Sequence, residues 1–372
     1  MPARAGKPPA VPRVLRRVSK ITRDFSTMHT VSFDTLRGFV QDIFEAAGVR
    51  TAIAHKVSES LALANLLGHD SHGIVRASLY LDQIGSGMLD PASDPEPLEE
   101  SPSVFIMDAK RNFGQWSAYL TIKKAIEKAA DCGIAAGGIT NSGHVGRLGE
   151  WVTMAADAGY IGLAFCNGGG RRGIVAPFGG SERLMSTNPL AAAVPLEGRD
   201  PIVIDFATSV VAEGKVKIAH NKGMDLPPGS MLDKDGNPSV KPQDLYDGGV
   251  LLPFGGHKGS GLSLLNDVMA GLLTGSGVPQ EGEGAMNNGA FFILLRIETF
   301  RALGAFLGDA GDYVAFFKSV RPAPGFDEVM LPGEPEARTA AERRAHGIPV
   351  DDVTWRSLVE AAAGVGVEAP RR

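Results

Sequence analysis

The stretch "AFCNGGGRRGIVAPFGG", residues 164–180, decides between two kinds of fold. Its glycines spell G-x-G-x-x-G over residues 168–173, directly after "IGLAFC", a run typical of a buried strand. In a Rossmann fold the third glycine of this pattern leads into a helix whose N-terminus faces a pyrophosphate. Here Gly173 leads instead into "IVAPFGG", where Pro177 and two further glycines disfavour a helix.

A second feature of the Rossmann pattern is also missing. A Rossmann unit ends its second parallel strand in an acidic residue about 20 residues after the glycines. No such strand follows here. We therefore reject the Rossmann interpretation and expect residues 168–173 to form a loop beside a cleft. On this interpretation alanine at Gly173 costs little stability, unless the position needs a positive φ.

Hydrophobic periodicity predicts where the other helices and strands lie. Apolar side chains at spacings of three and four indicate helices, and short apolar runs bounded by turn residues indicate strands. The predicted helices are 32–48, 51–68, 74–87, 114–133, 149–159 and 257–275, and the predicted strands are 103–109, 134–141, 160–166, 190–195, 201–207 and 289–297. The polar, Pro-rich "ASDPEPLEESPS" before residue 104 indicates a connector.

These elements predict a mixed α/β fold with helical ends. The sequence is helical in pattern before residue 104 and again mostly helical after residue 298. We expect residues 29–104 and 299–372 to pack together as a helical domain beside an α/β domain, residues 105–298.

Composition narrows the class of protein. The chain has 372 residues, 44% of them hydrophobic and 21% charged, which is ordinary for a globular protein. A net charge of −5 gives no reason to expect a nucleic acid or an anionic membrane surface as partner. No apolar run approaches the ~18 residues of a membrane span. Two cysteines in apolar surroundings favour a reducing cytoplasm over a disulfide framework.

The first 28 residues differ from the rest. They hold seven Lys or Arg, one acidic residue and four prolines, with no apolar periodicity. An Arg-rich segment poor in acids is typical of a targeting sequence. The simpler interpretation, which we favour, is a disordered tail or a translation start at Met28.

Histidines in glycine-rich loops are the first candidates for chemistry. His72 lies in "GHDSHGIVR", His144 in "NSGHVGRLG" and His257 in "GGHKGSG". Zinc binding by the first loop is disfavoured because it has neither a helical i,i+4 pair nor paired thiols, and we expect no metal. A serine nucleophile is disfavoured because no G-x-S-x-G elbow occurs.

Three charged residues complete this set. Asp205 ends an apolar strand in "VIDFATS", where it can cap a helix, orient an imidazole, or accept from a ribose or an amide. Lys258 follows His257 at the expected start of a helix, where backbone N–H groups favour phosphate. Arg76 follows His72 by four residues and can hold a carboxylate through two hydrogen bonds, or simply be solvated.

Six motifs in register make the chain resemble one family. "GHDSHGIVR", "NSGHVGRLGEW", "STNPLAAAVP", "VIDFATS", "HKGSGLSLL" and "LPGEPE" occur in the order found in the malate/L-lactate dehydrogenase family of non-Rossmann NAD(P)-dependent oxidoreductases. The resemblance covers about residues 31–365. It implies a cofactor domain on a mixed, largely antiparallel sheet, hydride transfer between 2-hydroxy and 2-oxo acids, NAD or NADP as cofactor, and an intertwined homodimer.

The resemblance also assigns the candidate residues. Those implied in catalysis are His72, His144, Asp205, Arg76 and Ser71. Those implied in cofactor binding are His72, Gly146, Arg147, Leu148, Val203, Ile204, Asp205, Phe206, Ala207, His257, Lys258, Asn288, Gly333, Glu334, Pro335 and Glu336. Two positions depart from the family pattern: Ser186 stands where relatives commonly have glycine, and Glu150 precedes Trp151 where they often have an aromatic residue.

The expected activity is therefore a 2-hydroxyacid dehydrogenase acting on malate, lactate or a related acid. Two alternatives on the same scaffold are reduction of a cyclic imine such as piperideine-2-carboxylate and oxidation of ureidoglycolate. A third is a dinucleotide-binding protein without catalysis, against which His72, His144, Asp205 and Lys258 argue.

Overall fold

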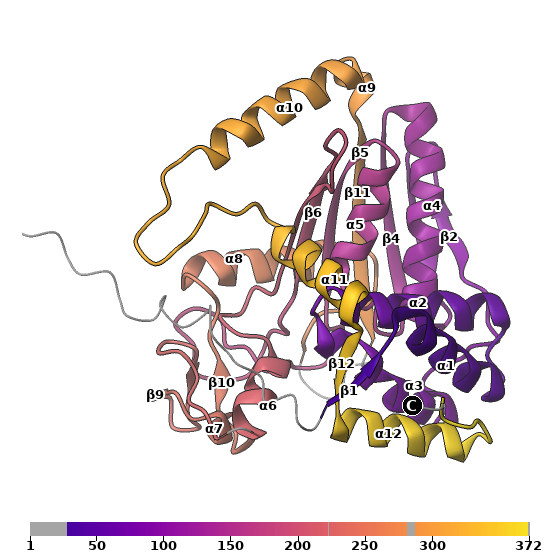
Figure 1. The fold of residues 1–372 in the computed structure, drawn as a ribbon, viewed down its shortest axis with the longest axis vertical. Coiled ribbons are helices and arrows are strands. Elements are labelled where there is room, and N and C mark those ends of the chain that lie inside the picture. Colours follow the sequence, from indigo (N-terminus) through magenta and orange to yellow (C-terminus); the bar gives the residue numbers. More distant parts are fainter. Residues whose placement is uncertain (1–27, 222, 281–286, 371–372) are drawn as a thin grey trace, which may run out of the picture.

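A computed structural model describes residues 28–221, 223–280 and 287–370. Its largest element is a seven-stranded sheet (Figure 1). In spatial order the strands are β2 (Glu96–Glu100), β3 (Val104–Asp108), β4 (Ile134–Ser142), β11 (Asn288–Arg296), β5 (Tyr160–Asn167), β6 (Leu190–Val194) and β7 (Ile202–Phe206). Only β3 and β4 pair in parallel, through the crossover helix α4 (Gly114–Cys132). The expected mixed, largely antiparallel sheet is confirmed.

The edge strand β2 corrects one sequence expectation. We expected a connector before residue 104, but Glu96–Glu100 pairs with β3. All five residues of this strand are exposed, so it has no buried face that could produce an alternating pattern. Glutamates and a proline are typical of an edge that must not pair with another chain.

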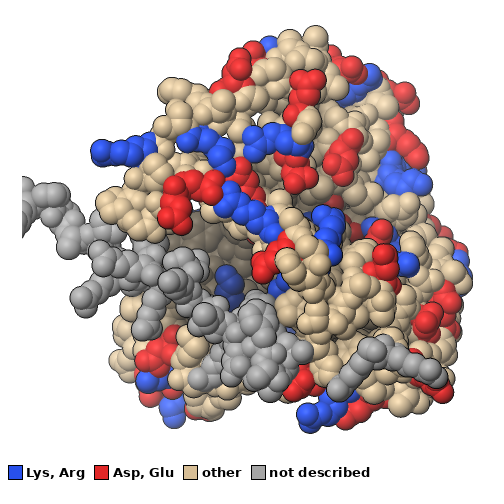
Figure 2. All heavy atoms as spheres, in the orientation of Figure 1, with Lys and Arg blue, Asp and Glu red and all other residues tan. Residues whose placement is uncertain are grey.

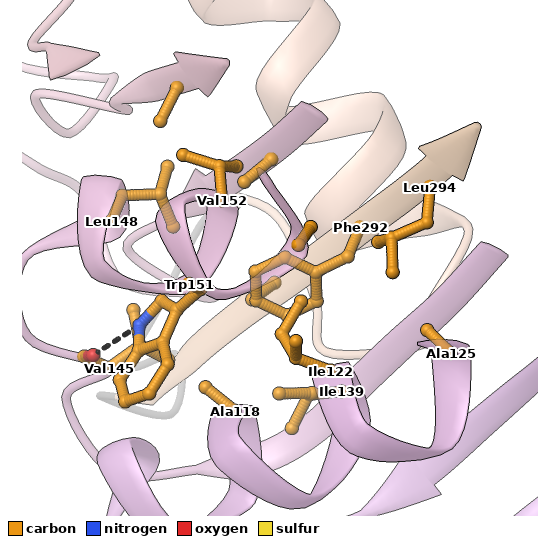
Figure 3. Packing of buried hydrophobic residues seen from close by; sticks show 14 of the residues in the cluster. Ala118, Ile122, Ala125, Ile139, Val145, Leu148, Trp151, Val152, Phe292 and Leu294 are labelled. Carbon is orange, nitrogen blue, oxygen red and sulfur yellow. Dashed lines mark hydrogen bonds between the residues drawn. The ribbon is translucent and has the colours of Figure 1, made fainter. Parts of the chain in front are cut away.

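One face of the sheet carries the main core. The helices α4 and α5 (Leu148–Asp157) lie against it, and Trp151 and Phe292 pack between them and the strands (Figure 3). The neighbouring Phe291 points to the opposite face, because side chains alternate along a strand. There it packs on η5 (Asp267–Leu272), a π-helical segment that continues α8 (His257–Asn266).

The two ends of the chain form a second core together. β1 (Met28–Val31) pairs with β12 (Ile348–Asp351). The helices of this core are α1 (Phe33–Ala46), α2 (Thr51–Leu66), α3 (Ala77–Gly85), α11 (Glu334–His346) and α12 (Asp352–Gly364). The predicted extension, residues 1–28, lies outside the described residues except for Met28, which begins β1.

A third, smaller lobe was not foreseen as a separate core. Its buried residues include Val175, Val216, Met231 and Leu251. Its elements are α6 (Glu213–Asn221), β8 (Met231–Leu232), β9 (Pro238–Ser239), α7 (Pro242–Tyr246) and β10 (Val250–Leu251). Strands of two residues are too short to show periodicity, so hydrophobic patterning could not find them.

The glycine stretch enters this lobe without forming a helix. Between β5 and β6 the chain turns and makes an isolated bridge from Val175 to Met185. The rejection of a Rossmann turn is therefore confirmed. Our expectation for Gly173 was wrong, however: a Cβ there would lie 2.2 Å from the carbonyl oxygen of Met185, a backbone atom that cannot rotate away.

An arm leaves the sheet after β11 and returns at α11 (Figure 1). It contains α9 (Ile297–Phe300) and α10 (Leu303–Lys318). Of the residues of α10, only Val314 is buried. On the face of the molecule shown in Figure 2, acidic and basic side chains are interspersed. No helix among the described residues is long and apolar enough to cross a membrane.

Candidate active site

The loop after α2 places the first histidine. It forms two short 3₁₀ turns, η3 (Asp70–His72) and η4 (Ile74–Arg76). The buried Asn65 side chain holds both: its Nδ2 donates to Asp70 Oδ1 at 2.9 Å, and its Oδ1 accepts from Ile74 N at 2.8 Å. The loop is therefore fixed on the last turn of α2.

A clamp from α11 holds the same loop from the other side. The buried Arg343 guanidinium donates to Asp70 Oδ1 at 2.7 Å and to Asp70 Oδ2 at 3.3 Å, and also to the carbonyl of Asn65. His69 Nε2 lies 3.4 Å from Glu336 Oε1 on the first turn of α11. Sequence reasoning missed Asn65 and Arg343, because neither lies in a glycine-rich or motif-bearing segment.

The two principal histidines lie together. The rings of His72 and His144 are stacked, with centroids 5.4 Å apart and planes inclined by 25°. Ser71 Oγ lies 3.1 Å from His72 Nδ1. Arg76 Nε donates to the carbonyl of Ser71 at 2.8 Å, which sets the plane of the guanidinium beside the histidines. Four of the five predicted catalytic residues thus form one cluster.

Both histidines are neutral at neutral pH. Burial lowers the pKa of His72 to about 4, and the charges of Arg76, His69 and Arg147 contribute to the same shift. Burial also holds the pKa of His144 well below its usual value, helped by Arg76 and His72. An arriving carboxylate would offset the arginine charge and raise both pKa values.

These pKa shifts predict acid-sensitive stability. Between pH about 6.5 and about 4 the unfolded chain binds protons at His72 that the folded chain does not, so stability falls as the pH is lowered through this window. One pKa unit is about 1.4 kcal/mol, so His72 alone contributes a loss of up to about 3 kcal/mol. Urea unfolding measured across the window checks this. A His72→Gln variant should show a shallower decline; an equal decline would contradict the assignment.

Asp205 lies apart from the histidines. Its Oδ2 accepts from Gly149 N at 2.7 Å, at the start of α5, and lies 4.0 Å from Arg147 Nη1. Burial raises its pKa, and Arg147 opposes that shift. Within the described chain Asp205 makes no hydrogen bond or ion pair with His72 or His144, so this structure does not bring it into the predicted catalytic cluster.

A cavity of about 600 Å³ borders the site, between α2, α5, β7 and the start of α11. The predicted cofactor residues that line the cavity are Arg147, Val203, Ile204, Asp205, Phe206, Gly333, Pro335 and Glu336. The catalytic loop reaches it through His69. Eight predicted positions, from three distant segments, therefore meet at one cavity.

Some of the other predicted cofactor residues adjoin the cavity and others do not. Gly146 and Leu148 flank Arg147 in the chain, and Ala207 directly follows β7. Asn288 Oδ1 accepts from Val145 N at 3.1 Å and so holds the loop of His144. Glu334 faces away from the cavity, toward Lys318 Nζ at 2.6 Å.

His257 and Lys258 lie elsewhere, at the first turn of α8, where both are exposed. The helix predicted to start there is confirmed. The ring of His257 contacts that of Phe178 edge-on, with centroids 5.9 Å apart. These two residues do not line the 600 Å³ cavity.

Sequence reasoning did not predict an ion pair that lies in the wall of the cavity. Lys56 Nζ, on α2, lies 2.9 Å from Glu150 Oε1, on α5. Ser60 Oγ donates to the same Glu150 oxygen at 2.8 Å. Glu150 was noted as a departure from the family pattern; the structure shows it paired in the wall of the cavity, where it joins the helical and sheet cores.

The cavity residues fit a dinucleotide. Its volume lies within the range of about 300–1,000 Å³ typical of small-molecule sites. Leu63, Leu67 and Val203 offer apolar walls for rings. The Nε of Arg147 is buried and makes no hydrogen bond within the described chain. A buried donor without a partner is rare, and a phosphate or amide oxygen of a ligand would satisfy it.

The comparisons with known proteins agree with this geometry. The malate/L-lactate dehydrogenase family matches residues 31–359. The chain is 36% identical to malate dehydrogenase of Pyrococcus horikoshii over 90% of its own length and 95% of that protein's. It is 33% identical to hydroxycarboxylate dehydrogenase B of Escherichia coli, over 91% and 95%. The crystal structure of malate dehydrogenase from Entamoeba histolytica superposes with a TM-score of 0.88 at 29% identity, over 92% and 100%.

Similarity of this extent places the protein among the dehydrogenases that interconvert 2-hydroxy and 2-oxo acids with NAD(P) outside the Rossmann fold. The chain belongs to the malate/L-lactate dehydrogenase family. The family resemblance inferred from the six motifs is therefore confirmed. Other relatives carry different names: ureidoglycolate dehydrogenase (NAD(+)) of Escherichia coli is 32% identical, and a Δ1-pyrroline-2-carboxylate/Δ1-piperideine-2-carboxylate reductase of Pseudomonas syringae is 33% identical.

Proposed function

We propose that His72 is the acid/base of a malate- or lactate-type dehydrogenase and that Arg76 binds the substrate carboxylate. The observation that carries this is the cluster of His72, His144 and Arg76 beside a cavity that fits a dinucleotide. A nicotinamide cofactor supplies the hydride acceptor or donor when bound. Proton transfer and binding of the substrate carboxylate are assigned to side chains of the protein.

Proton transfer is assigned to His72. As the C2–H bond of the hydroxy acid breaks, its hydroxyl proton must go to a neutral base, and the lowered pKa of His72 keeps the ring neutral. If Nδ1 carries the proton and donates to Ser71 Oγ, the lone pair of Nε2 is free for the substrate. Ser71 then acts by fixing the tautomer of His72.

Carboxylate binding is assigned to Arg76. Its Nε is occupied by the carbonyl of Ser71, and its two terminal nitrogens make no hydrogen bond within the described chain. A guanidinium held in this way can donate both terminal N–H groups to one carboxylate. The substrate is thereby oriented with its C2 oxygen toward the histidines.

Arg147, Val203–Phe206 and the first turn of α11 would hold the cofactor, which is NAD or NADP. The role proposed for Asp205 follows from where the structure places it, which is away from the two histidines. Because it accepts from Gly149 N beside Arg147, we assign it to the cofactor wall and not to orientation of an imidazole. We propose a cytoplasmic location, which the unpaired Cys132 and Cys166 support.

One absorbance screen tests the activity. Reduced nicotinamide is followed with NADH and NADPH against pyruvate, oxaloacetate, a cyclic imine and, in the oxidative direction, ureidoglycolate. Turnover of a 2-oxo acid supports the proposal. The imine or ureidoglycolate alone would favour one of the alternatives suggested by relatives of those names. Cofactor binding without any turnover would indicate a non-catalytic paralogue.

We also propose a homodimer, supported by apolar surface in two places. The arm helix α10 exposes 73% of Phe316, and η5 exposes 60% of Leu272. The sheet face beneath η5 carries Leu163 and Ile293, which are only partly buried. An antiparallel sheet facing water would place polar residues there. Exposed aromatic and aliphatic side chains of this kind are typical of a subunit interface.

Disrupting this surface should separate the subunits. We expect Phe316→Asp combined with Leu272→Asp to convert a dimer into a monomer, because two charges would have to be buried without partners. Light scattering after gel filtration measures the mass. The control is Val353→Asp, 74% exposed and on α12, which lies at the opposite end of the molecule from α10 in Figure 1. Unchanged mass in the double variant would contradict the proposed interface.

A further inference from the structure

A buried tyrosine connects the helical core to the active site. Tyr80, on α3, is 1% exposed, and its ring packs against Phe44 and Phe113. Its hydroxyl lies 2.7 Å from Nδ1 of His144. Gln115, at the start of α4 and 0% exposed, donates from Nε2 to the same hydroxyl at 2.8 Å. Leaving a hydroxyl in an apolar core is costly unless it has partners, and here one of its two partners is an active-site histidine.

The direction of the Gln115 hydrogen bond indicates how protons are placed along this chain of hydrogen bonds. An amide N–H only donates, so the Tyr80 oxygen accepts from Gln115. The single phenolic proton is then left for Nδ1 of His144, which lies 2.7 Å away and would accept it. A neutral imidazole that accepts at Nδ1 carries its own proton at Nε2. Burial raises the pKa of Tyr80 to about 12, so the phenol keeps its proton at every working pH.

We infer that Tyr80 and Gln115 are positioning residues that hold His144 in the Nε2–H tautomer, so that His144 donates a hydrogen bond to the C2 oxygen of the substrate. This rests on the proposed function, in which His72 takes the proton from that oxygen. The two stacked rings then have opposite roles: His72 presents a lone pair, and His144 presents an N–H. A fixed donor stabilises the charge that develops on the oxygen as the proton and hydride leave.

The main test is Tyr80→Phe, which keeps the ring in its packing and removes only the hydroxyl. We expect kcat to fall about 10- to 100-fold, as for loss of a preorganised hydrogen bond to an oxyanion, while KM for the cofactor stays within about twofold. Donation to Nδ1 favours the neutral ring, so its loss raises the pKa of His144. The acidic limb of the kcat/KM profile should therefore move to higher pH.

Two further variants separate positioning from packing. Gln115→Met removes the hydrogen-bond donor to Tyr80, so the Tyr80 hydroxyl can accept from His144 instead of donating to it. We expect kcat and the acidic limb of the kcat/KM profile to change in the same direction as in Tyr80→Phe, but by less. The control is Tyr160→Phe, which removes a buried hydroxyl on β5 that donates to the carbonyl of Ile126 and does not touch the site. Its kcat and pH profile should match those of the wild type.

A second readout is independent of turnover. Long-range ¹H–¹⁵N correlation spectra of the full-length protein, with the His144 signals identified by their loss in His144→Gln, report which ring nitrogen carries the proton. We expect Nε2–H in the wild type and a mixture in Tyr80→Phe. An Nδ1–H ring in the wild type would overturn the inference, as would Tyr80→Phe with a wild-type pH profile and only a lower Tm. If no substrate is turned over but Nε2–H is observed, the proposed function fails and the tautomer assignment stands.

Discussion

Replacing His72 by Asn is expected to lower kcat at least ~10²-fold, and up to ~10⁴-fold, while the dinucleotide still binds. General acid–base catalysis contributes an effect of this size. An Asn side chain is polar and smaller than imidazole, so it can be accommodated in the partly exposed loop between Ser71 and Gly73. Its amide has no lone pair basic enough to take the hydroxyl proton.

Steady-state kinetics and fluorescence titration of the reduced cofactor measure the two effects separately. The cavity residues are untouched by this change, so Kd for the cofactor should stay within a few-fold of the wild type. Ser71→Ala is a graded comparison, since it removes only the contact to Nδ1 and should cost less. Near-wild-type turnover in His72→Asn would transfer the acid/base role to His144.

The second large effect is expected at Gly173. Alanine there should destabilise the fold by several kcal/mol, because its Cβ would lie 2.2 Å from Met185 O and 2.5 Å from the Cα of Ser186. Both neighbours are backbone atoms, so relief requires displacing the bridge between Val175 and Met185. Overpacking of this kind typically costs about 1–3 kcal/mol even where side chains can move.

A matched substitution, Gly38→Ala, is expected to change the free energy of unfolding in the opposite direction. Gly38 lies within α1, without a positive φ, and outside the helix's own backbone no atom lies within 4 Å of the position that a Cβ would take. Alanine there should stabilise the protein by about 0.5–1 kcal/mol, because glycine is a poor helix former. Urea unfolding of the two variants checks both signs. Equal stability of Gly173→Ala and the wild type would contradict the prediction, because it would show that the bridge between Val175 and Met185 can move at little cost.

The main elements were predictable because their causes are local. Trp151 and Phe292 lie in segments whose apolar spacing already indicated a helix and a strand. The position of Gly173 was not predictable, because the backbone that excludes a side chain is 12 residues away at Met185, in a turn without periodicity. The strand Glu96–Glu100 has no buried face, so nothing in its pattern distinguishes it from a connector.

The candidate site was predictable only in part, for a related reason. His72 and His144 stand out because glycine-flanked histidines in loops are poorly explained by packing. Tyr80 and Gln115 do not stand out, since a buried aromatic residue and a polar residue at a helix start are ordinary in amphipathic helices. Their partnership with His144 becomes visible only once three separate segments are brought together.

The clamp on the catalytic loop has a consequence for how the enzyme is made. Arg343 lies 273 residues after the Asp70 that it holds. During synthesis the helices and sheet can form while the ribosome is still translating, since most of their partners have already emerged. The loop of His72 cannot reach its final geometry until α11 is released, near the end of translation. A nascent chain of this protein should therefore be compact well before it is active, which delays redox chemistry until the polypeptide is almost complete.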